Sequence, residues 1–175
     1  MSPEADRGLS LVVCVGLLCL TVLAAFHDVL VAGHTLSAAA FVPGMTPSGP
    51  VGAQRPIGVP PVRDVEGAAW VDEPSPYLIH EALRDGHLPL WNEREGLGAP
   101  LAANLNAAAF APLALPVNLW PGPLSQDLTW LLRVLVLALG TLLLARGLGC
   151  GALGSLTAAL AILLSGSTRE WIVHH

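Results

Sequence analysis

The chain has 175 residues, of which 53% are apolar and only 12% are charged, and its formal net charge is −5. An ordinary soluble domain carries about 25% charged residues, so a soluble enzyme and a disordered tail are both poor interpretations. The negative net charge argues against a nucleic-acid partner, because phosphate backbones attract positively charged surfaces. A mean hydropathy of +0.62 is typical of an integral membrane protein.

The cysteines and histidines show no ligand pattern. Cys14, Cys19 and Cys150 fall in or beside apolar runs, and their spacing forms neither a disulfide framework nor a zinc motif. His80 and His87 flank a predicted helix, where they are either acid–base groups or plain surface residues. There is no glycine-rich phosphate loop and no nucleotide fingerprint, so the sequence predicts no cofactor and no Cys/His metal site.

Three long windows are almost free of charge. They are residues 9–26, residues 128–145 with Arg133 as the single charge, and residues 147–168. A helix needs roughly 20 apolar residues to cross a hydrocarbon core of about 30 Å. The windows predict an all-α integral membrane fold with three transmembrane helices, at 8–27, 126–146 and 151–167.

Arginines predict the orientation. Arg7 and Arg146 lie on one side of a three-span arrangement, and positive charge in short loops marks the cytoplasmic side. The predicted location is the cell membrane, with the N-terminus in the cytoplasm. The predicted non-membrane segments are 1–7 and 147–150 in the cytoplasm, and 28–125 and 168–175 outside it.

A cleaved signal peptide is the alternative interpretation of the first helix, and the small residues Ala24 and Ala25 would suit a cleavage site. The preceding flank holds Glu4 and Asp6 against a single Arg7, which is not the basic n-region of a signal peptide. The sequence therefore favours an uncleaved signal-anchor.

The large extracytoplasmic loop contains 14 of the 15 prolines. Residues 43–61 are rich in Pro and Gly and predict extended loop. Residues 75–86 predict a short interfacial helix, with Ser75 as its cap, Pro76 in its first turn and Gly86 at its end. We predict a second interfacial or re-entrant helix over 103–110, followed by a turn at 120–123.

Eight acidic residues crowd into 32 positions of this loop. A carboxylate near the membrane surface is able to act as a general base on a hydroxyl, and adjacent carboxylates are able to share a divalent cation. A solvated acidic loop is the alternative. Arg133 lies inside the second helix, where it either snorkels to the interface or binds a lipid phosphate. The acidic residues are Asp64, Glu66, Asp72, Glu73, Glu81, Asp85, Glu93 and Glu95.

Several strings resemble the N-terminal part of the bacterial YfhO-like membrane proteins, which belong to the GT-C glycosyltransferase class. The resemblance covers about residues 60–175, and its most specific part is "GHLPLWN" followed by "GAPL". The matching strings are Trp70–Pro74, Leu83–Asn92, Gly98–Asn104, Phe110–Leu113, Ala145–Gly149 and Leu164–Gly166.

The resemblance implies that the chain is a fragment of a larger polytopic fold. It also implies an enzyme that transfers a sugar from a polyprenyl-phosphate donor on the extracytoplasmic side of the cell membrane. Asp72 matches the family's loop aspartate and inherits the catalytic role. Glu73, next to Asp72 in the sequence, and Arg133, the charged residue of the second predicted span, are candidate substrate-binding residues. Three further candidates, Trp91, Asn92 and Asn104, match positions that shape the loop near the donor.

The sequence departs from the family pattern at three places: Ala38–Ala40 replace an acidic residue, Glu93 replaces a proline, and Asn106 replaces a glutamine. The expected partners are the lipid bilayer, a lipid-linked sugar donor, and the remaining helices of a longer chain or a partner membrane subunit. The alternatives to an enzyme are a non-enzymatic membrane anchor or assembly subunit and an inactive truncated remnant.

Overall fold

The computed structural model describes residues 11–42, 55–56, 69–70 and 73–165, and these are mostly helical. The α-helices are α1 (Leu11–Ala25), α2 (His27–Leu30), α4 (Ser75–Arg84), α5 (Leu115–Leu119), α6 (Pro123–Gly147) and α7 (Ala152–Leu163). Two short 3-10 helices, η2 (Ala38–Phe41) and η4 (Pro112–Ala114), and two strands, β1 (His34–Thr35) and β2 (Arg55–Pro56), complete the described elements.

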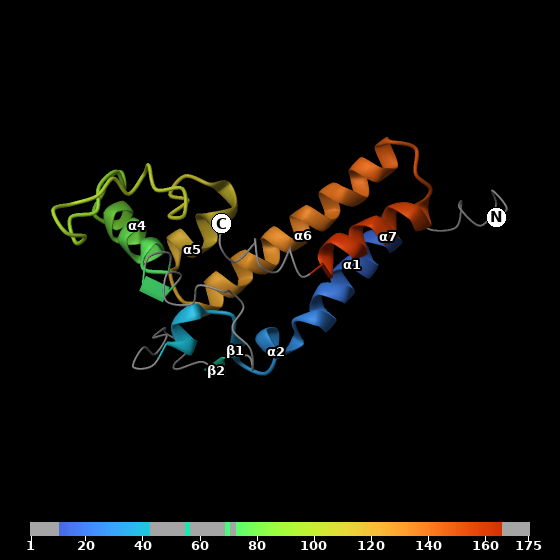
Figure 1. Cartoon of the computed structure of the whole chain (residues 1–175), viewed down its shortest axis with the longest axis horizontal. Coiled ribbons are helices and arrows are strands. Elements are labelled where there is room, and N and C mark those ends of the chain that lie inside the picture. Colours follow the sequence, from blue (N-terminus) through green and yellow to red (C-terminus); the bar gives the residue numbers. More distant parts are fainter. Residues whose placement is uncertain (1–10, 43–54, 57–68, 71–72, 166–175) are drawn as a thin grey trace.

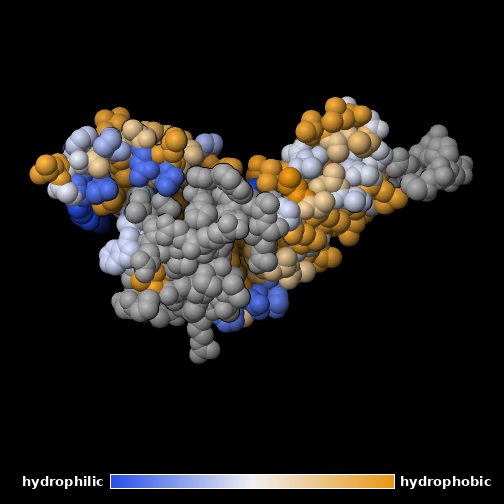
Figure 2. All heavy atoms as spheres, in the orientation of Figure 1, coloured by the Kyte–Doolittle hydropathy of each residue, from blue (hydrophilic) through white to orange (hydrophobic). Residues whose placement is uncertain are grey.

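Helices α1, α6 and α7 pack together into a bundle (Figure 1). Residues four positions apart share one face of a helix, and one such row on each helix is buried. The bundle core is formed by Cys14, Leu18, Val22, Val134, Ala138, Leu142, Ala159 and Leu163. The outward faces of the bundle are also apolar, with Leu20 and Leu144 more than 60% exposed. Figure 2 shows apolar side chains over the bundle, on the right of the view.

Helix α6 is the element that fits a membrane span. Its 25 residues rise roughly 37 Å at 1.5 Å per residue, enough for a hydrocarbon core of about 30 Å. In the described part of the chain, it is the one helix both long and apolar enough to cross a membrane. Helices α1 and α7 have 15 and 12 residues and are shorter than a full span. The described part of the chain therefore contains one helix of full span length, and the three-span arrangement stays a prediction.

The residues at the two ends of α4 explain where this helix begins and ends. The predicted helix over 75–86 is confirmed as Ser75–Arg84, with Pro76 in its first turn. Ser75 is the first helical residue rather than the cap, which is Pro74. Gly86 follows the helix with φ +78°, a left-handed conformation that glycine adopts without steric cost. Ile79 is fully buried on the inner face of α4.

The predicted helix over 103–110 is wrong, because this stretch consists of turns. The Asn106 backbone N–H donates to Asn104 Oδ1 at 3.0 Å, a local bond that competes with helix formation. Ala108 has φ +47°, which is incompatible with a right-handed helix. Helix begins later, in η4 and α5, whose prolines suit first turns.

The turn predicted at 120–123 is confirmed, since α5 ends at Leu119 and α6 begins at Pro123. Residues 43–54 and 57–61 of the predicted extended loop lie outside the described residues. Between them, Arg55–Pro56 forms β2, which pairs in parallel with β1. This pairing joins the loop to the residues that follow α2 and was not predicted.

We call residues 73–122 the head. It comprises α4, the loops after it, η4 and α5, and it lies beside the N-terminal end of α6, away from the turn between α6 and α7 (Figure 1). A small apolar core formed by Ile79, Leu101, Ala107 and Ala109 holds it together.

Candidate functional site: a polar pocket beside two buried carboxylates

Glu73 is buried at the start of the head and accepts hydrogen bonds from a segment far away in the sequence. Ser37 Oγ donates to Glu73 Oε2 at 2.7 Å, and the backbone N–H of Ala38 donates to Oε1. The backbone N–H of Ala39 lies 3.4 Å from Oε2. Glu73 is only 8% exposed, so these donors replace water around a charged group.

Asp127, in the first turns of α6, is a second buried carboxylate that accepts hydrogen bonds from the same segment. Its Oδ1 accepts the backbone N–H of Leu36 at 2.9 Å and the hydroxyl of Thr35 at 3.2 Å. The residue is fully buried, and its Oδ2 has no hydrogen-bond partner among the described residues. The Thr35 hydroxyl also accepts the backbone N–H of Ser37 at 3.0 Å, which links the two carboxylate sites.

Two carboxylates thus fix residues 35–39. Glu73 belongs to the head and lies 36 residues along the chain from Ser37, whose hydroxyl donates to it. Asp127 belongs to α6 and lies 92 residues from Thr35, whose hydroxyl donates to it. Hydrogen bonds to an ionised carboxylate stabilise its charge and occupy its lone pairs. Glu73 is therefore better suited to holding this segment than to taking a proton from a substrate.

A pocket of about 740 Å³ opens beside Glu73. Five parts of the chain line it: the 35–39 segment, residues 69–70, residues 73–78 at the start of α4, the loop over 92–104, and the start of α6. Its polar side chains are those of Ser37, Glu73, Ser75, Tyr77, Asn92, Arg94, Glu95, Asn104 and Gln126, and Trp70 is its largest apolar one.

The "LPLWN…GAPL" string builds one wall of the pocket. Asn92 and Ala99 exchange backbone hydrogen bonds of 2.7 and 2.9 Å, which close a hairpin-like loop. Gly98 has φ +97°, and a Cβ at this position would overlap the indole of Trp91. Two features therefore require glycine at this position: the left-handed backbone conformation and the close approach of the Trp91 side chain.

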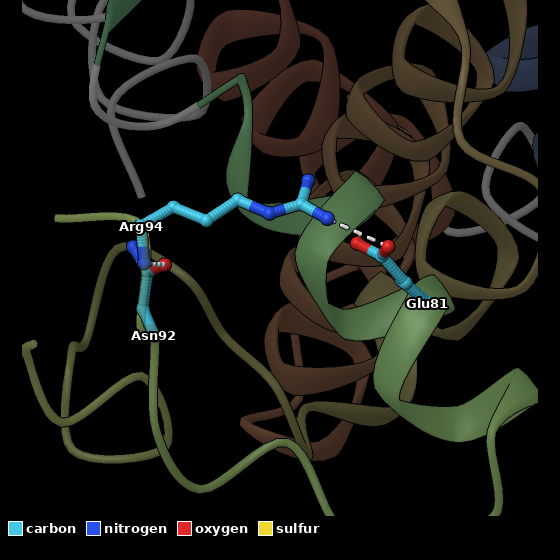
Figure 3. A network of polar contacts seen from close by, with 3 residues as sticks. All are labelled: Glu81, Asn92 and Arg94. Atoms are coloured by element: carbon cyan, nitrogen blue, oxygen red, sulfur yellow. Dashed lines mark hydrogen bonds and ion pairs between the residues drawn. The ribbon is translucent and has the colours of Figure 1, made fainter.

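Asn92 and Arg94 order the tip of this loop (Figure 3). Asn92 Oδ1 accepts the Arg94 backbone N–H at 3.0 Å, and its Nδ2 donates to Glu95 at 3.3 Å. The Arg94 guanidinium reaches across to Glu81 on α4 at 2.6 Å. Because both side chains are about half exposed or more, this ion pair adds at most about 1 kcal/mol.

Tyr77 brings a hydroxyl to the pocket. Partial burial raises the pKa of its phenol above the ordinary value of 10.0, and the negative charge of Glu73 raises this pKa further. The phenol therefore stays protonated at neutral pH.

The structure brings together some of the predicted site residues. Glu73, Asn92 and Asn104 line the pocket, whereas Trp91 packs on Gly98 and is not a pocket-lining residue. Arg133 lies further along α6 and is not among the pocket-lining residues. Asp72, the predicted catalytic residue, lies outside the described residues.

Sequence reasoning missed Asp127, Thr35, Ser37 and Gln126. The available signal was Asp127 itself, an acidic residue at the start of a largely apolar helix, since ionisable residues in such segments mark functional sites. The "GHTLS" string over 33–37 carried the hydroxyls, but nothing in the sequence indicated their partners.

Within the described residues there is no group of three or more His, Cys, Asp or Glu side chains placed to hold a metal ion. The hypothesis that Asp72 and Glu73 share a divalent cation stays a prediction. A cation at Glu73 would compete with the Ser37 hydroxyl and the N–H groups of Ala38 and Ala39 for the same carboxylate.

Comparisons of the chain with protein-family models, with curated proteins and with solved structures found no match.

Proposed function

We propose that this chain forms the N-terminal part of a membrane glycosyltransferase of the GT-C class, which transfers a sugar from a polyprenyl-phosphate donor on the extracytoplasmic side. One observation carries the proposal: a polar pocket of about 740 Å³ includes residues at the start of α6, the helix that fits a membrane span. A lipid-linked donor presents its sugar at the membrane surface, which is where such a pocket would meet it. The resemblance of the loop strings to YfhO-like proteins supports the same class.

In this proposal Asp72 is the general base. It takes the proton of an acceptor hydroxyl, the oxygen attacks C1 of the donor sugar, and the polyprenyl phosphate leaves with the electron pair of the broken bond. Glu73, next in the chain, holds the 35–39 segment rather than reacting. Asn92 and Asn104 form the pocket wall, and Arg133 offers a guanidinium to a lipid phosphate.

The proposal includes the three-span topology. Helices α1 and α7 flank α6 in the membrane of a bacterial cell, the N-terminus and the turn after α6 lie in the cytoplasm, and the head lies outside. The remaining helices of a longer chain would cover the apolar outer faces of the bundle.

The second candidate is a non-enzymatic membrane anchor or assembly subunit, and a truncated remnant would share its lack of activity. This candidate is favoured by exposed apolar side chains on the head, which a partner subunit would cover. They are Leu88, Leu90, Leu97, Leu105 and Phe110. An adjoining reading frame that continues through many further hydrophobic spans would favour the enzyme instead.

Sugar transfer by the protein encoded by the full reading frame tests the proposal. Asp72→Asn keeps the side-chain shape and removes the base, so transfer from a polyprenyl-phosphate sugar in proteoliposomes should fall about 10²–10⁴-fold. Membrane insertion should be unchanged. Glu93→Gln is the matched control, because Glu93 is exposed and is not a pocket-lining residue. Normal transfer by Asp72→Asn would show that this carboxylate is not the base.

A further inference from the structure

We propose that the pocket beside Glu73 is an acceptor subsite for a neutral, hydroxyl-rich saccharide, and that the phosphate of the donor binds outside it. This inference rests on the proposed glycosyltransferase function and names the ligand class of that pocket.

The pocket's polar groups suit hydroxyl ligands. Asn92, Asn104 and Gln126 each carry an amide that both donates and accepts hydrogen bonds. Tyr77 adds a hydroxyl that is protonated at neutral pH. A sugar hydroxyl also donates and accepts hydrogen bonds. Sugar hydroxyls therefore pair with these amides and with the phenol without leaving a buried charge. The volume of about 740 Å³ lies within the range of small-molecule sites.

Trp70 supplies the apolar part of such a site. It lines the pocket while 65% of it remains exposed, so its indole is available for contact. The C–H face of a pyranose ring packs against an aromatic face, and the ring hydroxyls remain free for the amides around it. A pocket with one open indole and three amides therefore matches a saccharide in both its apolar and its polar groups.

Charge decides between a neutral ligand and a phosphate. Among the described lining residues, Glu73 and Glu95 bring two carboxylates, and Arg94 brings the single cationic side chain. That guanidinium is already paired with Glu81 at 2.6 Å. Among these described residues the carboxylates outnumber the cationic side chains, so an anionic phosphate would meet a lining of net negative charge, which costs binding free energy.

Direct binding tests the inference on the full chain in phosphatidylcholine nanodiscs. Alkyl glucoside and maltoside detergents are avoided, because their sugar headgroups would compete for the pocket. The probes are the methyl glycosides of glucose, galactose, mannose and N-acetylglucosamine, with glucose 1-phosphate as the anionic comparison. Saturation-transfer NMR should show saturable binding of at least one methyl glycoside, about tenfold or more tighter than that of the phosphate.

Two exposed tryptophans give a matched pair of variants. Trp70→Ala should weaken methyl-glycoside binding about tenfold, because it removes the aromatic surface in the pocket. Trp120→Ala should not weaken it, because Trp120 is 73% exposed and is not a pocket-lining residue. Gln126→Ala should also weaken binding about tenfold through the lost amide.

Three results would overturn the inference: no methyl glycoside binds, glucose 1-phosphate binds more tightly, or Trp70→Ala and Trp120→Ala behave alike. If any of these occurs while the full-frame protein still transfers sugar, the subsite assignment fails and the glycosyltransferase proposal stands. If the glycosides bind as expected but no transfer is found, the glycosyltransferase proposal fails and the saccharide site stands.

Discussion

The bundle and the head are stabilised by different interactions. In the bundle, apolar rows on α1, α6 and α7 pack on one another, and side chains such as Leu18 and Leu142 are fully buried. In the head, the apolar core is small, and hydrogen bonds fix the segments that line the pocket. The most buried of these reach from Glu73 to the 35–39 segment.

This difference implies that the two regions tolerate different changes. Apolar packing is distributed over many contacts, so no single polar group determines the bundle. The head depends on a few directed bonds, and removal of the Glu73 carboxylate would leave the buried N–H of Ala38 unpaired. Single substitutions in the head should therefore loosen the pocket while the bundle remains folded.

Removal of the Glu73 carboxylate should have the largest effect. Glu73→Ala leaves the backbone N–H groups of Ala38 and Ala39 without their acceptor, which costs on the order of 3 kcal/mol locally. Amide hydrogen exchange over 36–39 should quicken about a hundredfold, while exchange in α6 beyond residue 130 stays unchanged. Glu93→Ala is the control and should leave both regions as they are. Slow exchange over 36–39 in Glu73→Ala would contradict the role assigned to this carboxylate.

Gly98→Ala should have the next largest effect. It places a side chain at φ +97° and against the Trp91 indole, so the loop over 92–99 should lose about 1–3 kcal/mol. Gly96→Ala is a matched control at φ +57°, where a Cβ meets nothing within 4 Å. Limited proteolysis should cut Gly98→Ala in this loop several times faster than Gly96→Ala. Equal rates would mean that Trp91 does not pack on Gly98.

A titration of Tyr77 gives the smallest effect and a clean readout, because this is the single tyrosine of the chain. Its raised pKa predicts a tyrosinate absorbance midpoint above 10. Glu73→Gln should lower the midpoint only partly, because burial is the larger cause. Since the folded state holds this proton more tightly, stability should fall as the pH rises from about 10 through the midpoint. A midpoint at or below 10 would place Tyr77 in solvent.

Local patterns in the sequence predicted the parts of the fold that depend on neighbouring residues. Hydropathy located α6, and the Pro76 and Gly86 signals located α4. The helix expected over 103–110 failed because an asparagine side chain captured a nearby backbone N–H, which apolar composition does not reveal.

The site was predictable only where its residues follow one another in the chain. Asn92 and Asn104 belong to one short loop motif, and both line the pocket. Asp127 and Thr35 are 92 residues apart, and their contact depends on how α6 meets the segment after α2. Long-range polar pairs leave no periodic signal in a sequence. Glu73 was a predicted candidate, but its bond to Ser37 and the pairing of Asp127 with Thr35 emerged only from the structure.

The proposed topology puts the two ends of α6 on opposite sides of the membrane, with the pocket outside. Cysteine labelling in intact spheroplasts tests it directly, in a chain whose Cys14 and Cys19 are replaced by alanine. Ala103 is an exposed pocket-lining residue, and Cys150 is exposed at the other end of α6. A membrane-impermeant maleimide should label Ala103→Cys at once and Cys150 only after permeabilisation. Labelling of Ala103→Cys only after permeabilisation, or of both positions at once, would contradict the account.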